Sequence, residues 1–249
     1  MSVIVAVTGK GGVGKSTMAA CLIRSAIEGG LAPVLAVDAD PNSTLAPMLG
    51  QKVTATISEI RDEVLKEKAN VTGISKERIL EMKLQECMVE AKGFDLLTMG
   101  HPEGPTCYCY VNTLLRGALS TMRANYKMTL VDNEAGMEHL SRMNTDNIDC
   151  MVFVTEPTIS STWAVKRTYD LSLGLPVEVR RKVLVWNKIR AHGIPENVRE
   201  PLADCQFDEV IEVPMDENME LLSIGTRDVF SLPLPGPVNR LLDACGLRA

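Results

Sequence analysis

The chain has 249 residues, a net charge of −6 at neutral pH and a pI of about 5.2. Its apolar fraction of 45% and charged fraction of 23% are ordinary for a protein that folds in water, and its length suits one large α/β domain or two small ones. The acidic balance disfavours a nucleic-acid partner, which normally requires a basic surface. Because no run of about 18 apolar residues occurs, we expect neither a membrane span nor a membrane partner.

The cysteines give an expectation about the compartment. The sequence carries seven of them and starts with an apolar run, SVIVAVT, that has no basic leader. We therefore expect a cytoplasmic protein without a disulfide framework. Five cysteines stand in apolar contexts, which is typical of buried small hydrophobic side chains. These are Cys21, Cys87, Cys150, Cys205 and Cys245.

Short apolar runs alternate with helical patterns along the chain. Most runs are apolar at consecutive positions, as expected for strands covered on both faces. The predicted strands are residues 3–7, 33–38, 94–99, 128–132, 150–155, 182–187 and 209–214. The first predicted helix has an apolar stripe from Ala19 to Ile27 and ends at Gly29 and Gly30. Two further helices are predicted over about 112–122 and 160–173, and two more within the polar stretch 54–92.

This alternation of strands and helices continues over the whole chain. No repeat and no low-complexity linker interrupts it. The sequence therefore predicts a single three-layer α/β/α domain over residues 1–249, with a mostly parallel sheet and the two helices of 54–92 against the sheet edge.

A phosphate-binding pattern follows the first predicted strand. GKGGVGKS, residues 9–16, matches G-x-x-x-x-G-K-[ST] at the junction between a strand and a helix. Glycines let successive backbone N–H groups turn toward phosphate oxygens at a helix N-terminus. Lys15 would then reach the β- and γ-phosphates, and the Ser16 hydroxyl would bind Mg²⁺. The predicted nucleotide contacts are Gly11, Gly12, Val13, Gly14, Lys15, Ser16 and Thr17.

The same letters also contain a dinucleotide-binding pattern. Gly9, Gly11 and Gly14 give G-x-G-x-x-G, and Asp38 follows the second predicted strand. A dinucleotide-binding turn has no use for the lysine and serine that end the pattern. The triphosphate site, and with it a P-loop nucleotide triphosphatase, is therefore the favoured interpretation.

Lys10 is a second lysine inside this loop, within KGGVGK. With it the sequence resembles the deviant P-loop ATPases, the family that includes the nitrogenase iron protein and the Min and Par positioning ATPases. The resemblance implies a nucleotide-bound homodimer in which Lys10 crosses the two-fold axis and contacts the phosphates of the partner subunit. In the alternative interpretation, Lys10 is an ordinary solvated lysine of a loop.

The segment VDADPNST, residues 37–44, stands where this family has its first switch. The resemblance implies that Asp38 helps to hold the Mg²⁺ shell through water and that Asp40 orients or deprotonates the attacking water. In the alternative interpretation, one of these carboxylates only caps the turn that Pro41 and Asn42 favour.

A second segment, LVDNEAG at 130–136, resembles the second switch of the family. Asp132 is then the Walker-B-type carboxylate, and Gly136 is a hinge that responds to the γ-phosphate. His139, beyond this segment, is a weak candidate for a link between the nucleotide and a metal region.

The identity of the base is indicated by WNKIR, residues 186–190. Guanine-binding relatives use N-K-x-D, but here Arg190 stands in place of the aspartate that would accept from guanine. Adenine, and hence ATP, is therefore favoured. We expect Asn187 to contact the base, and the resemblance implies that the loop with Pro214 and Asp216 closes over the ring.

Two cysteines separated by one residue, Cys107 and Cys109, lie in GPTCYCYVN. Thiolates are soft ligands that suit Zn²⁺, Cu(I), iron–sulfur clusters and, in suitable geometry, Ni²⁺. One pair supplies too few sulfurs for a closed site, but a two-fold dimer supplies four. We therefore expect Cys107 and Cys109 of both subunits to form one shared site of four thiolates, with His101 as a less favoured further ligand.

Taken together, the P-loop with two lysines, VDADP, the cysteine pair and DNEAGMEHLSR resemble the CooC-type nickel-insertion ATPases. This resemblance covers essentially the whole chain. It implies an ATP-hydrolysing homodimer that delivers nickel to a client, either apo-carbon monoxide dehydrogenase or apo-acetyl-CoA synthase.

Several alternatives remain open at this point. The two thiols could be idle, could form a redox pair, or could hold a bridging [4Fe–4S] cluster, although DNEAGMEHL offers no cluster cysteine. The rival function is that of a positioning or partition ATPase that associates reversibly with a surface. The short C-terminus, PVNRLLDACGLRA, lacks the basic amphipathic helix expected of membrane-binding members.

Overall fold

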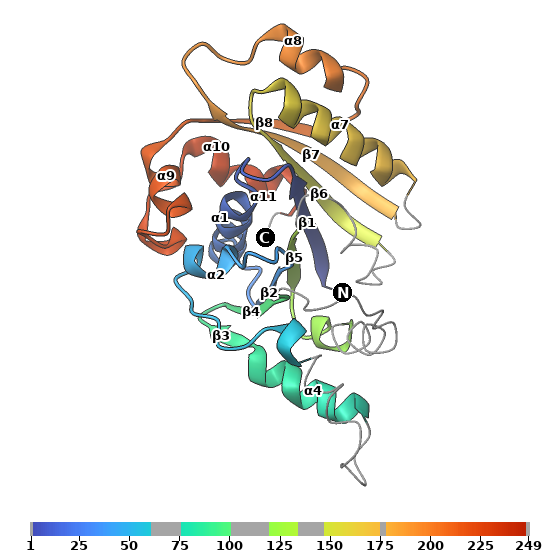
Figure 1. Cartoon of the computed structure of the whole chain (residues 1–249), viewed down its shortest axis with the longest axis vertical. Helices are drawn as coiled ribbons and strands as arrows, with labels where there is room; N and C mark the ends of the chain where they lie inside the picture. The colour runs from blue at the N-terminus through green and yellow to red at the C-terminus, as the bar shows by residue number, and fades with distance from the viewer. Residues whose placement is uncertain (1, 61–75, 101–119, 134–146, 175–177, 248–249) are drawn as a thin grey trace.

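Eight strands form one sheet in the computed structural model, which describes residues 2–60, 76–100, 120–133, 147–174 and 178–247. Across the sheet the order is β3-β4-β2-β5-β1-β6-β7-β8 (Figure 1). Neighbouring strands pair in parallel except β3 and β4, which are antiparallel. The strands are β1 (Val3–Gly9), β2 (Val34–Asp38), β3 (Val89–Ala91), β4 (Phe94–Thr98), β5 (Met128–Asp132), β6 (Asn147–Thr155), β7 (Glu178–Ile189) and β8 (Glu209–Pro214).

Helices cover both faces of this sheet (Figure 1). One face packs against α1 (Lys15–Glu28), α2 (Leu45–Met48), α9 (Glu217–Ser223), the 3₁₀ turn η2 (Val229–Ser231), α10 (Gly236–Asn239) and α11 (Leu241–Ala244). The other face packs against α4 (Lys76–Cys87), α7 (Ile159–Leu173), α8 (Glu196–Arg199) and the 3₁₀ turn η1 (Glu200–Leu202). The described helices include none with the length and apolarity needed to cross a membrane.

The central strands are buried on both sides, which explains their consecutive apolar residues. In β1, Val5 and Val7 pack toward α1 whereas Ala6 packs toward α7, and all three are fully buried. In β2, Val34 likewise faces the α1 layer, while Leu35 faces the layer of α4. The predicted single three-layer α/β/α arrangement with a mostly parallel sheet is confirmed.

The polar stretch 54–92 differs from the prediction of two helices. Residues 57–60 are helical and α4 is a helix, but Val89–Ala91 forms the edge strand β3. A two-residue turn connects β3 to β4, and Gly93 in this turn has a φ of 89°, which glycine adopts without strain. The sequence prediction missed this hairpin because β3 has only three residues, too few to show the alternation of apolar and polar side chains that indicates a strand. Of the helix predicted over 112–122, the described residues 120–122 are helical.

The parallel strands bring their carboxyl ends to one edge of the sheet. Asp38 at the end of β2 pairs in register with Asp132 at the end of β5 and with Thr98 at the end of β4. At the same edge, β1 ends at Gly9 and continues into the loop that opens α1. The predicted phosphate loop and the predicted carboxylates therefore share one end of the sheet.

Candidate nucleotide-binding site

The loop from Gly9 to Gly14 connects β1 to α1 through backbone conformations that require glycine. Gly12 has a φ of 83° and Gly14, the N-cap of α1, a φ of 96°. A Cβ atom on Gly14 would collide with the side-chain amide of Asn187, and one on Gly9 would collide with the carbonyl oxygen of Val154. Both sites thus exclude larger residues for steric reasons as well as for φ.

The predicted phosphate ligands lie at the start of α1. Lys15 is only 5% exposed, and its Nζ donates a hydrogen bond to the carbonyl oxygen of Lys10 at 3.3 Å. Ser16 and Thr17 are buried beside it in the first helical turn, and Val13 is buried below the loop. The helix N-terminus with its unpaired N–H groups and a lysine at its base is suited to bind an anion.

Asp132 is a fully buried carboxylate with neither oxygen hydrogen-bonded among the described residues. Burial raises its pKa to about 7; the negative charge of Asp38 adds to this, whereas Ser16 and the ammonium of Lys15 oppose it. The Ser16 hydroxyl makes its hydrogen bond with Thr44, at 2.8 Å between the two oxygens, rather than with Asp132. An unpartnered buried carboxylate is costly and needs a ligand to offset the cost.

Asp38 is held differently, although it is also fully buried. One of its oxygens accepts from the backbone N–H of Leu45 at 3.0 Å and the other from that of Asp40 at 3.2 Å. These bonds fix the segment after β2. Burial nevertheless raises the pKa of Asp38 to about 6, against the lowering effect of the two N–H groups.

These oxygen donors fit a Mg²⁺ ion. Mg²⁺ is a hard cation that favours carboxylate, hydroxyl and phosphate oxygens and keeps several waters. Asp132 supplies two carboxylate oxygens without partners, and the Ser16 hydroxyl stands close enough to affect its pKa. Ser16, Asp132 and Asp38 are the residues that would hold the ion or its water shell.

Asp40 forms a turn with its neighbour. Its Oδ1 accepts from both the backbone N–H and the side-chain amide of Asn42, each at 2.9 Å. This is the local bond pattern expected of an Asx turn. The carboxylate is half-buried and lies two residues beyond the end of β2.

Lys10 points toward another element. Its Nζ donates to the hydroxyl of Ser160 at 3.0 Å, in the first turn of α7. The bond is exposed, and the side chain therefore lies at the junction of β6 and α7.

The end of β7 holds the phosphate loop from the side. The Asn187 amide donates to the carbonyl oxygen of Val13 at 2.8 Å, and the Lys188 ammonium donates to that of Gly12 at 2.6 Å. Lys188 has a φ of 58°, which is uncommon for a residue with a side chain. Asn187 was predicted as a base contact; the structure places it against the loop, where it has a positional role that the sequence analysis missed.

The loops after β7 and β8 meet beside this point. The backbone N–H of Met215 donates to the carbonyl of Ile189 at 2.8 Å. Pro214 ends β8, and Asp216 caps α9 by accepting from two backbone N–H groups at 2.9 and 3.1 Å. A hollow of about 260 Å³ adjoins the loops and is lined by Glu156, Pro157, Thr158, Lys188, Arg190, His192 and Met215.

The predicted metal pair, Cys107 and Cys109, lies outside the described residues, as do His101, Gly136 and His139. Within the described part of the chain, no group of three or more His, Cys, Asp or Glu side chains could hold a metal ion. The five other cysteines are free thiols, four of them buried and Cys205 half-buried.

Comparison with known protein families decides what kind of site this is. Residues 4–224 match the family described as the CobQ/CobB/MinD/ParA nucleotide binding domain. The chain belongs to this family. It is therefore an ATP-binding P-loop ATPase of the MinD/ParA type, in agreement with the geometry of the loop.

Individual members of the CobQ/CobB/MinD/ParA family differ in how closely they match. An uncharacterized ATP-binding protein of Methanocaldococcus jannaschii is 40% identical over 190 residues, which cover 75% of each chain. Carbon monoxide dehydrogenase accessory protein CooC of Rhodospirillum rubrum is 34% identical over 195 residues, which cover 70% of each chain. A solved ParA family ATPase from Chlorobium tepidum has a TM-score of 0.68 and 17% identity, covering 98% of this chain and 97% of that one; this likeness shows the fold.

Besides the bond of Asn187 to Val13, three further contacts of side chains in the site were not predicted from the sequence. They are Thr44 with Ser16, Ser160 with Lys10, and Lys188 with Gly12. Thr44 belongs to the predicted first switch and Lys188 to WNKIR, so their motifs carried a signal. Ser160 had none, because it lies 150 residues from its partner in a helix chosen only for its apolar pattern.

Proposed function

We propose that this protein is an ATP-dependent nickel-insertion factor, which hydrolyses MgATP as a homodimer and supplies nickel to apo-carbon monoxide dehydrogenase or apo-acetyl-CoA synthase. The observation that carries the proposal is the 34% identity over 195 residues to a carbon monoxide dehydrogenase accessory protein. The cysteine pair at 107 and 109 supports it, because a positioning ATPase has no use for two thiols separated by one residue.

In the proposed hydrolysis the N–H groups at the start of α1 and Lys15 bind the triphosphate. Asp40 orients a water for in-line attack on the γ-phosphorus and accepts the proton that this water loses; a P–O bond forms to that water while the bond to the β-phosphate oxygen breaks. Lys10 leaves Ser160 and contacts the phosphates of the partner subunit. The Mg²⁺ ion bound with ATP neutralises charge on the phosphate oxygens.

Adenine is proposed to lie between the loops that follow β7 and β8, with Asn187, Pro214 and Asp216 around it. The meeting of these loops through Met215 and Ile189 supports this placement. Residues 1–249 are proposed to form one ATPase domain that acts in the cytoplasm.

Nickel is the cargo in this proposal. Cys107 and Cys109 of each subunit supply four thiolates to one ion at the two-fold axis, a set that would also accept zinc. ATP binding brings the two pairs together, and hydrolysis separates them. The four bonds to the ion are thus available only while both subunits hold nucleotide.

Anaerobic activation of separately purified apo-enzymes tests this function. Apo-carbon monoxide dehydrogenase or apo-acetyl-CoA synthase is mixed with Ni²⁺, MgATP and this protein. We expect activation by the wild type and by Cys205→Ser, a matched change of a half-buried cysteine, but not by Cys107→Ser or Lys15→Ala. Activation that is equal with and without the protein would contradict the proposal. ATP-dependent co-sedimentation with liposomes or DNA without any activation would favour the positioning function.

A further inference from the structure

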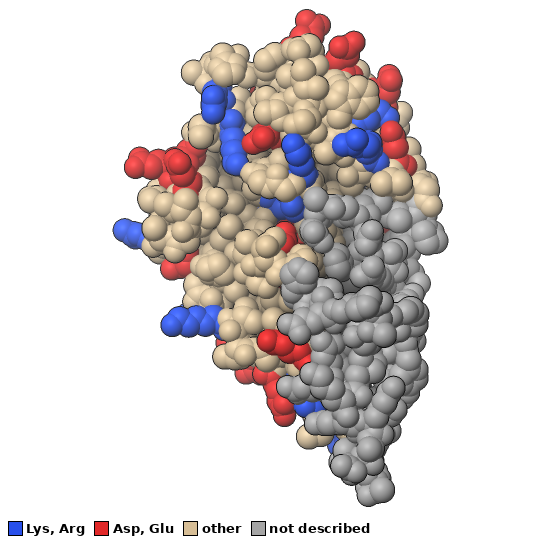
Figure 2. All heavy atoms as spheres, in the orientation of Figure 1, with Lys and Arg blue, Asp and Glu red and all other residues tan. Residues whose placement is uncertain are grey.

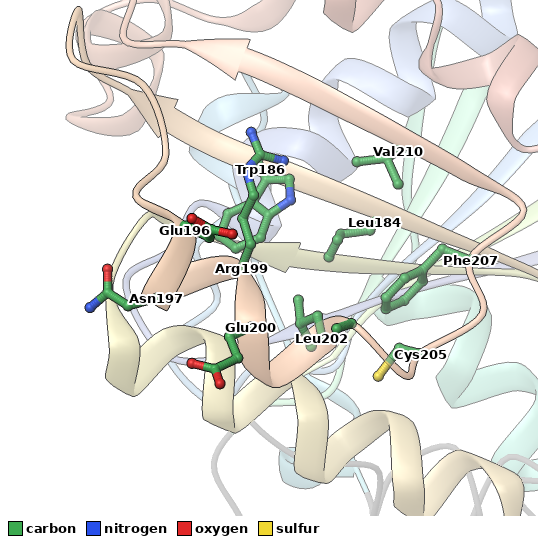
Figure 3. A pocket seen from close by; sticks show the side chains of 11 residues that line it. Leu184, Trp186, Glu196, Asn197, Arg199, Glu200, Leu202, Cys205, Phe207 and Val210 are labelled. Atoms are coloured by element: carbon green, nitrogen blue, oxygen red, sulfur yellow. The ribbon is translucent and has the colours of Figure 1, made fainter.

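A large groove lies at the edge of the sheet, away from the phosphate loop. It has a volume of about 990 Å³ and runs between strands β7 and β8 on one side and α8 with η1 on the other (Figure 3). Its volume is in the range of known binding pockets, yet the ATPase site makes no use of it. Its apolar lining is Leu184, Trp186, Leu202, Ala203, Cys205, Phe207 and Val210.

The floor and the open side of this groove differ in exposure. Leu184 and Trp186 from β7 are 3% and 2% exposed, whereas Val210 from β8 is 49% exposed. Figure 3 shows Arg199 lying over Trp186, with its guanidinium carbon 5.8 Å from the centre of the ring. Arg199 also pairs with Glu212 of β8 at 2.7 Å, so one side chain of α8 connects the two walls of the groove.

One wall of the groove is the last strand of the sheet. Within the described residues β8 pairs only with β7, so its outer edge presents backbone N–H and C=O groups that lack a neighbouring strand. An extended peptide can add to such an edge and place alternate side chains in an adjacent groove.

The chain around the groove is strongly acidic. Residues 196–212 carry six carboxylates and one arginine, and all seven side chains are exposed. Glu196 and Glu200, which line the groove, form no ion pair with any described residue. Figure 2 shows acidic side chains at the upper end of the molecule, where α8 lies in Figure 1.

We propose that this groove binds an extended segment of a partner protein that combines apolar anchor residues with lysine or arginine. The apolar lining takes the anchors, and the acidic wall attracts the cations and rejects acidic segments. This inference concerns a surface distinct from the ATPase site and holds whether or not the partner receives nickel.

The Arg199–Glu212 pair makes the groove responsive to such a segment. Both side chains are about half exposed, and exposed ion pairs contribute little to stability. A cation of the segment can therefore replace Arg199 at Glu212. Arg199 then moves off Trp186 and frees the indole ring for an apolar anchor.

Charged residues on edge strands also protect sheets against aggregation, and Glu212 serves this purpose in any case. Protection against aggregation does not explain the apolar groove beside these charges, because charged side chains protect an edge strand without such a groove. The apolar groove and the charged edge strand together favour a selective binding site over an edge that is only protected against aggregation.

Titration of the full-length protein with three blocked decapeptides tests the proposal. In the first, leucine alternates with lysine; in the second, glutamate replaces lysine; in the third, serine replaces leucine. The protein carries Trp163→Phe, which leaves Trp186 as its sole tryptophan. We expect a saturable change in Trp186 emission and a matching heat in calorimetry with the leucine–lysine peptide alone.

Two matched pairs of variants locate the binding. The double variant Glu196→Gln/Glu200→Gln should weaken binding about tenfold at low salt and by less at high salt. The control Glu217→Gln/Glu220→Gln, a pair in the first turn of α9, should leave binding unchanged. Val210→Ser should weaken it, whereas Ile224→Ser, at a more exposed apolar site on another element, should not. The proposal is overturned if the leucine–lysine peptide does not bind, if the glutamate peptide binds as tightly, or if both variants of a matched pair behave alike.

Discussion

Lys10 donates a hydrogen bond from its Nζ to the hydroxyl of Ser160 at 3.0 Å, and so joins the phosphate loop to the first turn of α7. The backbone of the same residue accepts from Lys15, whose ammonium is buried under the loop. The two lysines of the motif are thus separated, one inside the site and one at its rim. In the proposed dimer the outer lysine exchanges Ser160 for the phosphates of the partner.

This relationship predicts different effects for two substitutions. Lys10→Ala should abolish ATP-dependent dimerisation and leave the folded monomer intact, because the side chain is exposed and its hydrogen bond goes to a surface hydroxyl. Ser160→Ala removes the resting partner of Lys10. Because this bond from the ammonium is exposed to solvent, it is worth at most about 1 kcal/mol, so dimerisation should strengthen by up to about fivefold per chain. Light scattering with MgATP measures both. A normal ATP-dependent dimer of Lys10→Ala would contradict the assigned role.

A second prediction concerns Asn187. Its side-chain amide is buried and donates to the carbonyl oxygen of Val13. In Asn187→Asp a carboxylate oxygen takes the place of the donating N–H, so two hydrogen-bond acceptors face each other. We expect a loss of about 1–3 kcal/mol in the free energy of unfolding and weaker ATP binding. Lys188→Met, which removes the exposed bond to Gly12, should cost less than this. Urea unfolding and ATP titration measure the two effects, and equal losses would show that burial of the bond does not matter.

A third prediction follows from the raised pKa of Asp132, about 7 against an ordinary 3.8. The folded state without nucleotide retains a proton that the unfolded chain releases, so the free energy of unfolding falls as the pH rises from about 4 to 7. Asp132→Asn cannot ionise. It should therefore be more stable than the wild type above pH 7, by as much as about 4 kcal/mol, and equal to it near pH 4.

Denaturant unfolding in the presence of a chelator, at pH 4.5 and pH 8, measures this difference. The same variant should lose Mg²⁺-dependent ATP hydrolysis, because the oxygens proposed to serve the ion are replaced. If Asp132→Asn were less stable than the wild type at pH 8, the buried, ionised carboxylate of Asp132 would not lower the free energy of unfolding, and the prediction would be wrong.

Much of the fold follows from local pattern. The central strands are mostly apolar at consecutive positions because both of their faces are covered, so β1, β2, β4 and β5 were predicted close to their observed bounds. The helix α7 was likewise predicted to within one residue of its observed start. The phosphate loop was predicted because its glycines and Lys15 are adjacent in the sequence. The edge strand β3 was not, because three residues that are half exposed have no distinctive pattern.

The contacts of the site that were not predicted from the sequence share one cause. Ser160 and Lys188 reach the loop from 150 and 176 residues away, and this proximity depends on β6 and β7 lying beside β1 in the sheet. Motifs specify which residues meet a phosphate within one loop. They do not specify which side chains of other strands hold that loop in place, since this requires the strand order.

In the proposed function, two chains joined by ATP share one metal ion through Cys107 and Cys109. The most direct test of this arrangement is metal analysis of the protein with Ni²⁺ and MgATP under anaerobic conditions, with the molar mass of the same sample measured by light scattering. We expect a dimer with one nickel per two chains, and loss of the metal but not of ATP binding in Cys107→Ser. A protein that stays monomeric with MgATP, or that binds nickel equally well without Cys107, would contradict it.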